Sequence, residues 1–332
     1  MSRSSSANNE AFTQGKLKHL HYDEKAKTLH FKKTNDNQDE ELQHQFYEQL
    51  PLCDIADVLR FVNGSSCYSL AFTHIQPRYS KIFVNENGLI ATIIAQALNN
   101  GNLNMADISD IPYDTLLDTY QSRLHLRTLK QANDIISDDI SKMPIFPLYS
   151  LDMILLYASL DGQKYEVTRP TIKARYSKKY YGKGKGVVAY TMLYNHIPLQ
   201  SDLIGAHDHE SYYAFDIWYN NTSSITPNVL TGDMHVINQY GRLIANAIIH
   251  YNSAILSKLK IKYEAEGNHK ALARLKRISP VAWRHIHFQG HFIFSNKAKL
   301  IELDMIVNHL VLQSKKDKIT TKNKQDIYAL TA

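Results

Sequence analysis

Three strand-like segments lie close together in the middle of the chain, and they constrain the fold more than any other feature. Residues 153–160 are apolar, residues 168–176 alternate in polarity, and residues 186–194 are β-branched and aromatic. A turn rich in glycine and lysine separates the second segment from the third. This order predicts an antiparallel meander, and residues 199–206 are a candidate for a fourth element.

Helical patterns flank these segments. Before them, apolar residues recur at spacings of three and four, which predicts helices over 52–62, 88–98, 112–126 and 129–140. The first helix is expected to stop at Asn63 and Gly64. After the strands, similar patterns predict a helix over 211–220, a short buried strand over 229–231, and helices over 242–260 and 270–277.

Composition indicates a folded globular protein. The chain has 332 residues, of which 44% are hydrophobic and 21% charged, enough for one large or two ordinary cores. Two cysteines without a metal-binding pattern, and the lack of a secretion signal or membrane-length apolar run, predict a cytoplasmic protein with reduced thiols. We expect five regions: a polar, weakly ordered N-terminus (1–45), a helical block (46–143), a sheet-bearing core (144–239), a C-terminal helical region (240–313) and a basic tail (314–332).

Two aspartates stand near the ends of strand-like segments. Asp161 follows the first strand, and Asp233 follows the short strand over 229–231. Two carboxylates presented by neighbouring strands are what a two-metal phosphoryl-transfer site requires. The residues alone also allow another interpretation, in which Asp161-Gly is a hairpin turn and Asp233 caps a helix.

A basic stretch lies between the second and third strand-like segments. Tyrosines and glycines accompany its six cations, which are Lys173, Arg175, Lys178, Lys179, Lys183 and Lys185. Cations neutralise phosphates, tyrosines can stack on bases, and glycines allow close approach, so the stretch is a candidate DNA-binding segment. A solvated hairpin tip explains the same composition, and the net charge of +6 does not decide between them.

Histidines give weaker indications. His235 could contact a scissile phosphate or could be a polar residue beside the site. The sequence His207-Asp-His-Glu matches no standard zinc spacing and predicts an exposed loop. Trp283 is expected to be a packing residue, and His285 and His287 are expected to lie on the surface.

Several motifs, in the same order along the chain, resemble one family. Asp161-Gly-Gln-Lys-Tyr, Tyr180-Tyr-Gly-Lys-Gly-Lys-Gly-Val and Thr231-Gly-Asp-Met-His-Val-Ile-Asn-Gln are similar to the catalytic domain of Tn-three family transposases. Leu50-Pro-Leu-Cys-Asp-Ile-Ala-Asp-Val-Leu and Ala71-Phe-Thr-His-Ile resemble the helical segment before that domain. Ile278-Ser-Pro-Val-Ala-Trp-Arg-His-Ile-His-Phe-Gln-Gly resembles the family's C-terminal signature. The resemblance extends over about residues 15–312.

The resemblance implies a fold, a chemistry and partners. The expected fold is α/β, with a partial ribonuclease-H-like mixed sheet flanked by the N-terminal helical block and the C-terminal helices. Asp161 and Asp233 would bind Mg²⁺ or Mn²⁺ and act in metal-dependent 3′-end nicking and strand transfer. The implied partners are transposon-end and target DNA, with self-association as in transposase assemblies.

The chain departs from the family pattern in two places. The family's third acid, a glutamate, belongs to a segment that is missing where Asn238 and Gln239 run directly into Tyr240-Gly-Arg, so we expect an internal deletion near Gln239. The family's upstream end-recognition region is also missing, which suggests N-terminal truncation. We therefore expect a defective transposase remnant. The alternatives are a non-catalytic DNA-binding protein that regulates or interferes with transposition, and a two-acid nuclease that recruits Glu264 or Glu266.

Overall fold

The computed structural model divides into two compact units, Met1–Gln45 and Phe46–Ala332. It describes residues 20–23, 28–31, 37–79, 84–150, 155–168, 171–208, 210–232, 239–295 and 301–311. The first unit contains an antiparallel pair of strands, β1 (Leu20–Asp23) and β2 (Thr28–Phe31), and helix α2 (Asn37–Tyr47) begins in it. These elements fall in the segment for which the sequence predicts weak order, whereas the basic tail over 314–332 lies outside the described residues.

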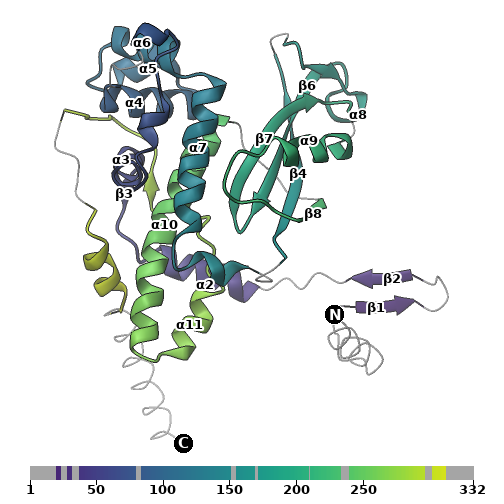
Figure 1. The fold of residues 1–332 in the computed structure, drawn as a ribbon, viewed down its shortest axis with the longest axis vertical. Helices are drawn as coiled ribbons and strands as arrows, with labels where there is room; N and C mark the ends of the chain where they lie inside the picture. Colours follow the sequence, from purple (N-terminus) through teal and green to yellow (C-terminus); the bar gives the residue numbers. More distant parts are fainter. Residues whose placement is uncertain are drawn as a thin grey trace, which may run out of the picture. The chain divides into compact units, whose positions relative to one another are not determined.

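The helices of the second unit pack around one long central helix. α10 (Gln239–Ala265) contacts α3 (Ile55–Ser66), α4 (Glu86–Ala97) and α7 (Leu126–Ser141) (Figure 1). Isoleucine and leucine side chains from these helices are buried, because their spacing of three to four residues puts them on one helix face. Other helices are α5 (Gly101–Asp107), α6 (Tyr113–Arg123) and α11 (His269–Leu275), and residues 303–311 are also helical. The 3₁₀ turns here are η1 (Tyr68–Ala71), η2 (Pro77–Tyr79) and η3 (Phe146–Tyr149). Helices that precede the sheet strands in the sequence therefore share one core with α10, which follows those strands.

Residues 279–295, which we call the C-terminal strap, run back along the N-terminal helices. Strand β9 (Ile286–His287) pairs in parallel with β3 (Cys53–Asp54). Further along, the Asp110 carboxylate accepts the backbone N–H groups of Phe294 and Ser295 at 2.6 and 2.7 Å.

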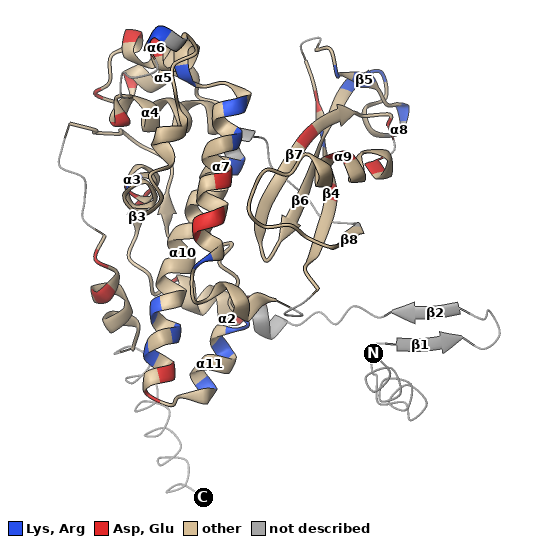
Figure 2. Ribbon diagram, viewed as in Figure 1, with Lys and Arg blue, Asp and Glu red and all other residues tan. Residues whose placement is uncertain are grey.

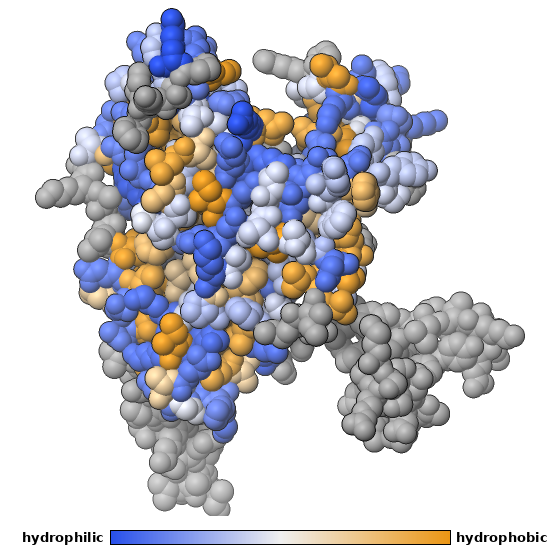
Figure 3. Space-filling model, viewed as in Figure 1, coloured by the Kyte–Doolittle hydropathy of each residue, from blue (hydrophilic) through white to orange (hydrophobic). Residues whose placement is uncertain are grey.

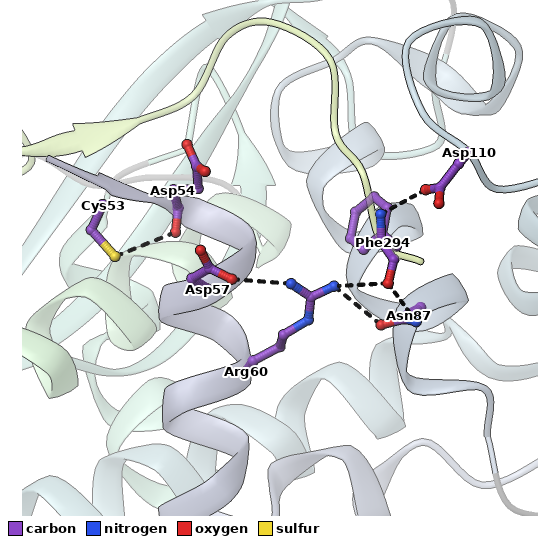
Figure 4. Close-up of polar contacts among 7 residues, drawn as sticks. All are labelled: Cys53, Asp54, Asp57, Arg60, Asn87, Asp110 and Phe294. Atoms are coloured by element: carbon purple, nitrogen blue, oxygen red, sulfur yellow. Dashed lines mark hydrogen bonds and ion pairs between the residues drawn. The ribbon is translucent and has the colours of Figure 1, made fainter. Parts of the chain in front are cut away.

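A guanidinium holds the end of the strap (Figure 4). Arg60 Nη1 donates to the Asp57 carboxylate at 3.0 Å, and its Cζ lies 5.3 Å from the centroid of the Phe294 ring. Asn87 Nδ2 donates to the Phe294 carbonyl at 3.0 Å. The strap is thus fixed by backbone pairing at one end and by a partly buried polar network at the other.

The sheet is mixed and contains five strands: β4 (Tyr157–Glu166), β5 (Arg175–Tyr176), β6 (Lys185–Tyr194), β7 (Ile197–Gly205) and β8 (Val229–Gly232). β4, β6 and β7 form an antiparallel meander, β8 runs parallel to β4, and β5 pairs with the start of β6. One short helix, α8 (Lys178–Tyr181), lies between β5 and β6. The turn η4 (Glu210–Tyr213) and helix α9 (Ala214–Tyr219) connect β7 to β8 (Figure 1). The mixed α/β fold expected from the sequence is confirmed.

Three sequence predictions about the elements are wrong. The second strand of the meander is not the segment 168–176, because β4 continues to Glu166 and pairs directly with β6, and among the described residues of that segment only the two of β5 are in a strand. β8 is not buried: Leu230 is 37% exposed, and β4 is its partner among the described strands. Helix α3 does not stop at Asn63 but continues to Ser66, and Cys67, with φ of 57°, ends it.

Arg242 joins the helical part to the sheet. Its side chain is buried on α10, where Nε donates to the Pro198 carbonyl at 3.1 Å and Nη2 donates to the Leu199 carbonyl. Both carbonyls belong to β7, which α7 and α10 contact. Among the described helices, none has the length and apolar character needed to cross a membrane.

Candidate active site and nucleic-acid interface

Asp161 lies in the middle of β4 and is 6% exposed. It is paired with Thr191 of β6, and the preceding residue, Leu160, is paired with Gly232 of β8. The hairpin interpretation of Asp161-Gly is therefore wrong, because the ladder with β6 runs without interruption to Glu166. Asp233 and His235 lie outside the described residues.

A row of oxygen-bearing side chains crosses the sheet at Asp161. Directly paired residues of antiparallel strands point to the same face, so Asp161 shares a face with Thr191, and Thr191 shares it with Ser201 of β7. Thr191 is buried, and in the described part of the chain its hydroxyl has no hydrogen-bond partner. These are hard oxygen ligands of the kind that Mg²⁺ prefers.

The described residues do not form a complete metal site by themselves. Within the described ranges, no three His, Cys, Asp or Glu side chains are grouped so that they could hold a metal ion. A divalent ion at Asp161 would therefore need oxygen ligands from water, substrate or residues outside those ranges.

The opposite face of β4 carries an ion pair. Lys164 Nζ lies 2.7 Å from Glu210 Oε1. A Cβ atom added to Gly162 would come within 2.5 Å of Glu210 Cδ, so glycine at this position lets η4 pack closely on the strand. Because successive residues of a strand face opposite sides, Glu210 does not share a face with Asp161.

The pKa values of Tyr190 and Lys164 follow from burial and from two nearby acids, Glu210 on this face and Asp161 on the other. Burial raises the pKa of Tyr190, and the carboxylates of Glu210 and Asp161 raise it further. Burial would lower the pKa of Lys164, but the hydrogen bond and charge of Glu210 outweigh it and raise that pKa overall. Lys164 therefore remains a cation within the sheet.

The predicted DNA-binding cations gather at one end of the sheet. We call this exposed group the basic corner; it comprises Lys173, Arg175, Lys178, Lys183 and Lys185 (Figure 2). Hydrophilic side chains predominate over β5 and α8 in the space-filling view (Figure 3). Lys179 belongs to α8, but its side chain is not among those described.

Local contacts fix the shape of the basic corner. Lys173 pairs with Asp202 at 3.0 Å, and Lys185 Nζ lies 5.3 Å from the centroid of the Tyr176 ring. A Cβ atom on Gly186 would collide with the Tyr181 ring and come within 2.7 Å of the Tyr165 carbonyl. A glycine is therefore required here because the Tyr181 ring packs against it. A bound phosphate is not needed to account for glycine at this position.

The basic corner and Asp161 lie at different positions along the sheet. Lys185 is six residues before Thr191, the partner of Asp161, which corresponds to roughly 20 Å along β6. The structure thus brings the cations together with one another and separates them from the acid.

Glu264 and Glu266 are remote from Asp161. Glu264 lies roughly 33 Å beyond Arg242 along α10 and forms an ion pair with Lys260 at 2.6 Å. Arg242 contacts β7, two strands or roughly 10 Å from β4. Glu264 is therefore more than about 15 Å from Asp161, and Glu266 lies beyond the end of the same helix. The interpretation as a two-acid nuclease that recruits either residue is wrong.

Sequence reasoning missed two features beside the basic corner. Lys164 lies between Glu210 and the Tyr180 ring, whose centroid is 4.7 Å from Nζ. Helix α9 exposes Phe215 and Tyr219, although the sequence predicted only that the segment is helical. The spacing of four residues between these two aromatic residues was a signal that both lie on one helix face.

Comparison with known proteins gives consistent results. The family model described as "Tn3 transposase DDE domain" matches residues 57–241 and 233–292. The "Transposase for transposon Tn4556" of Streptomyces fradiae is 23% identical over 195 residues, which make up 58% of this chain and 22% of that protein. The match therefore spans little more than a fifth of the length of this curated relative.

Proposed function

The chain belongs to the Tn3 transposase family, and on this premise we propose that it is a remnant of the DNA-cutting domain that lacks the third catalytic acid. The intact reaction would be metal-dependent 3′-end nicking followed by strand transfer. The observation that carries the proposal is the register of β8 on β4, which pairs Gly232 with Leu160.

This register bears on both aspartates. Asp161 follows Leu160, and Asp233 follows Gly232, so each acid is the next residue after a paired position. Neighbouring strands lie about 4.8 Å apart, so the pairing of Leu160 with Gly232 brings the two strands together at the positions directly before the two acids. Two acids that each follow a paired position of adjacent parallel strands in the sequence fit the proposed metal-binding role.

A bound Mg²⁺ or Mn²⁺ would polarise the scissile phosphate and activate the attacking water or 3′-hydroxyl. Asp161 and Asp233 would hold it. The burial of Asp161 beside Thr191 suits this role, because a shielded carboxylate interacts more strongly with a cation than one in bulk water.

Two observations support the loss of the third acid. The family match falls into two segments that overlap at residues 233–241, where the sequence predicts the deletion. The described acids that follow Gln239 lie near the C-terminal end of α10. Glu264 pairs with Lys260 there, and Asp304 pairs with Lys258. With two acids, we propose that the chain binds metal weakly and has little or no cutting activity.

The experiment measures metal binding and cutting separately. Titration of the purified chain with Mn²⁺ is expected to show weak binding. Asp161→Asn should reduce this binding, and the control Asp114→Asn, at an exposed acid of α6, should leave it unchanged. Nicking of supercoiled plasmid in Mg²⁺ or Mn²⁺ is expected at background level. Efficient nicking or strand transfer that Asp161→Asn abolishes would overturn the loss of activity, and equal Mn²⁺ binding by both variants would overturn the metal site.

The exposed basic corner favours a second candidate function, a non-catalytic protein that binds DNA and interferes with transposition. Lys185 lies roughly 20 Å from Asp161 along the sheet, a span of about six base pairs of duplex DNA. The cations could therefore bind a duplex without a catalytic contribution from Asp161. A gel shift that weakens with salt, and that Lys178→Ala with Lys183→Ala reduces, would support it. Equal retardation of the variant and the unchanged chain would exclude the basic corner as the contact.

A further inference from the structure

Helix α9 presents three aromatic side chains on one outward face. Phe215, Trp218 and Tyr219 are 62%, 39% and 72% exposed, whereas Ile217 on the other side is buried toward the sheet. The rings of Phe215 and Tyr219 are stacked, with centroids 5.7 Å apart and planes at 19°. The Phe215 and Trp218 centroids are 5.8 Å apart. We call these three residues the aromatic platform.

The platform adjoins the basic corner on the same side of the sheet. Lys164 connects them, because its Nζ lies 2.7 Å from Glu210 in η4, directly before α9, and 4.7 Å from the Tyr180 ring centroid in α8. In Figure 1, α8 and α9 are drawn at the same end of the sheet, in keeping with the two contacts of Lys164. Exposed Tyr176 and Tyr180 continue the aromatic surface among the cations.

We infer that the platform binds the unpaired bases of a DNA strand whose phosphates lie on the basic corner. This inference rests on the proposed function, in which the basic corner holds DNA. An exposed ring can stack only on a base whose face is free, and bases inside a duplex are covered by their neighbours. The ligand is therefore single-stranded or frayed DNA, in contrast to the intact duplex.

The charge distribution fits this orientation. The exposed helix α9 carries Asp216 and no cation, so it offers bases a stacking surface and repels phosphates. The positive charge comes from exposed Lys178 on α8, the helix whose Tyr180 ring Lys164 contacts, and from Lys183 and Lys185, which follow that helix. A strand crossing from one group to the other would meet cations along its backbone and rings along its bases.

The decisive measurement compares a fluorescein-labelled dT15 strand with a labelled 15-base-pair duplex, using fluorescence anisotropy and the full chain. Phe215→Ala with Tyr219→Ala is expected to weaken dT15 binding about tenfold and to leave duplex binding unchanged. Tyr219→Phe keeps the ring and should bind dT15 as the unchanged chain does. Tyr113→Ala, at an exposed tyrosine on α6, is the matched control and should have no effect.

Trp218 offers a direct signal of stacking. The chain has two tryptophans, so Trp283→Phe leaves Trp218 as the single source of tryptophan fluorescence. Binding of dT15 is expected to quench this fluorescence, and the duplex is expected to leave it unchanged.

The outcomes separate this inference from the proposed function. If Lys178→Ala with Lys183→Ala weakens binding of both DNAs while the platform variant weakens neither, the basic corner holds DNA and the platform inference is overturned. If the chain binds neither DNA, both the DNA-binding part of the proposed function and the platform inference are overturned. If sedimentation shows a dimer that the platform variant dissociates, with dT15 binding unchanged, the platform is a self-association surface and the inference is again overturned.

Discussion

Replacing His285 with phenylalanine is expected to remove a large part of the acid sensitivity of this fold. His285 lies in the C-terminal strap, and its ring is 3% exposed. It stacks on Tyr47, with centroids 5.3 Å apart and planes at 16°, and also lies against Tyr251. Among the described residues, neither ring nitrogen has a hydrogen-bond partner. Phenylalanine preserves the stacking and cannot be protonated.

The size of the effect follows from the pKa. Burial lowers the pKa of His285 from 6.5 to about 4, because a charged ring would lose its hydration. The unfolded chain therefore takes up a proton below pH 6.5, whereas the folded chain does so only near pH 4. The stabilising contribution is complete above pH 6.5 and is lost as pH falls to about 4. At about 1.4 kcal/mol per pH unit, the loss amounts to roughly 3 kcal/mol.

Urea unfolding at pH 7.0, 5.5 and 4.5, followed by circular dichroism, measures this contribution. His285→Phe should be as stable as the unchanged chain at pH 7.0 and increasingly more stable as pH falls. His291→Phe is the matched control, since the exposed His291 lies six residues away in the same strap and its replacement should leave the pH dependence of stability unaltered. Parallel pH profiles for the unchanged chain and His285→Phe would refute the reasoning.

Three other changes test the packing of the helices and the sheet. Arg242→Met leaves two β7 carbonyls without donors but also removes a buried charge, so the free energy of unfolding should fall by about 2 kcal/mol in urea titrations. Gly186→Ala forces the Tyr181 ring to move and should lower the midpoint of thermal unfolding together with DNA affinity in gel shifts. Asp139→Asn removes a carboxylate whose pKa is lowered by its hydrogen bond to His250. Its cost, about 1 kcal/mol at pH 7, should disappear as pH falls below 4, and equal costs at pH 7 and pH 3 in urea titrations would contradict the assignment.

Local sequence patterns were sufficient where neighbours along the chain decide the structure. The helix over 88–98 and the strand over 186–194 were predicted because apolar periodicity and β-branched residues act within a few positions. The family resemblance came from ordered motifs and is confirmed by the family match. The partnership of Asp161 and Asp233, and the role of His235, stay predictions.

The sequence did not reveal features that depend on distant partners. β4 extends past Asp161 because β6 offers a long edge for pairing. The polar residues Gln163 and Lys164 do not by themselves indicate a strand at this point. His285 was expected on the surface and Trp283 in the packing, yet His285 is buried and Trp283 exposed. Both outcomes follow from the pairing of the strap with β3, a contact that no local pattern signals.

The strap also determines when this protein can finish folding. Cys53 and Asp54 have their strand partners in Ile286 and His287, and Asp110 caps the backbone near Phe294. A ribosome must therefore synthesise the chain as far as Ser295 before the strap can close over the N-terminal helices, and such long-range contacts form slowly. During that interval the unclosed helices expose apolar surface, so the nascent chain would depend on chaperones more than its small helices suggest.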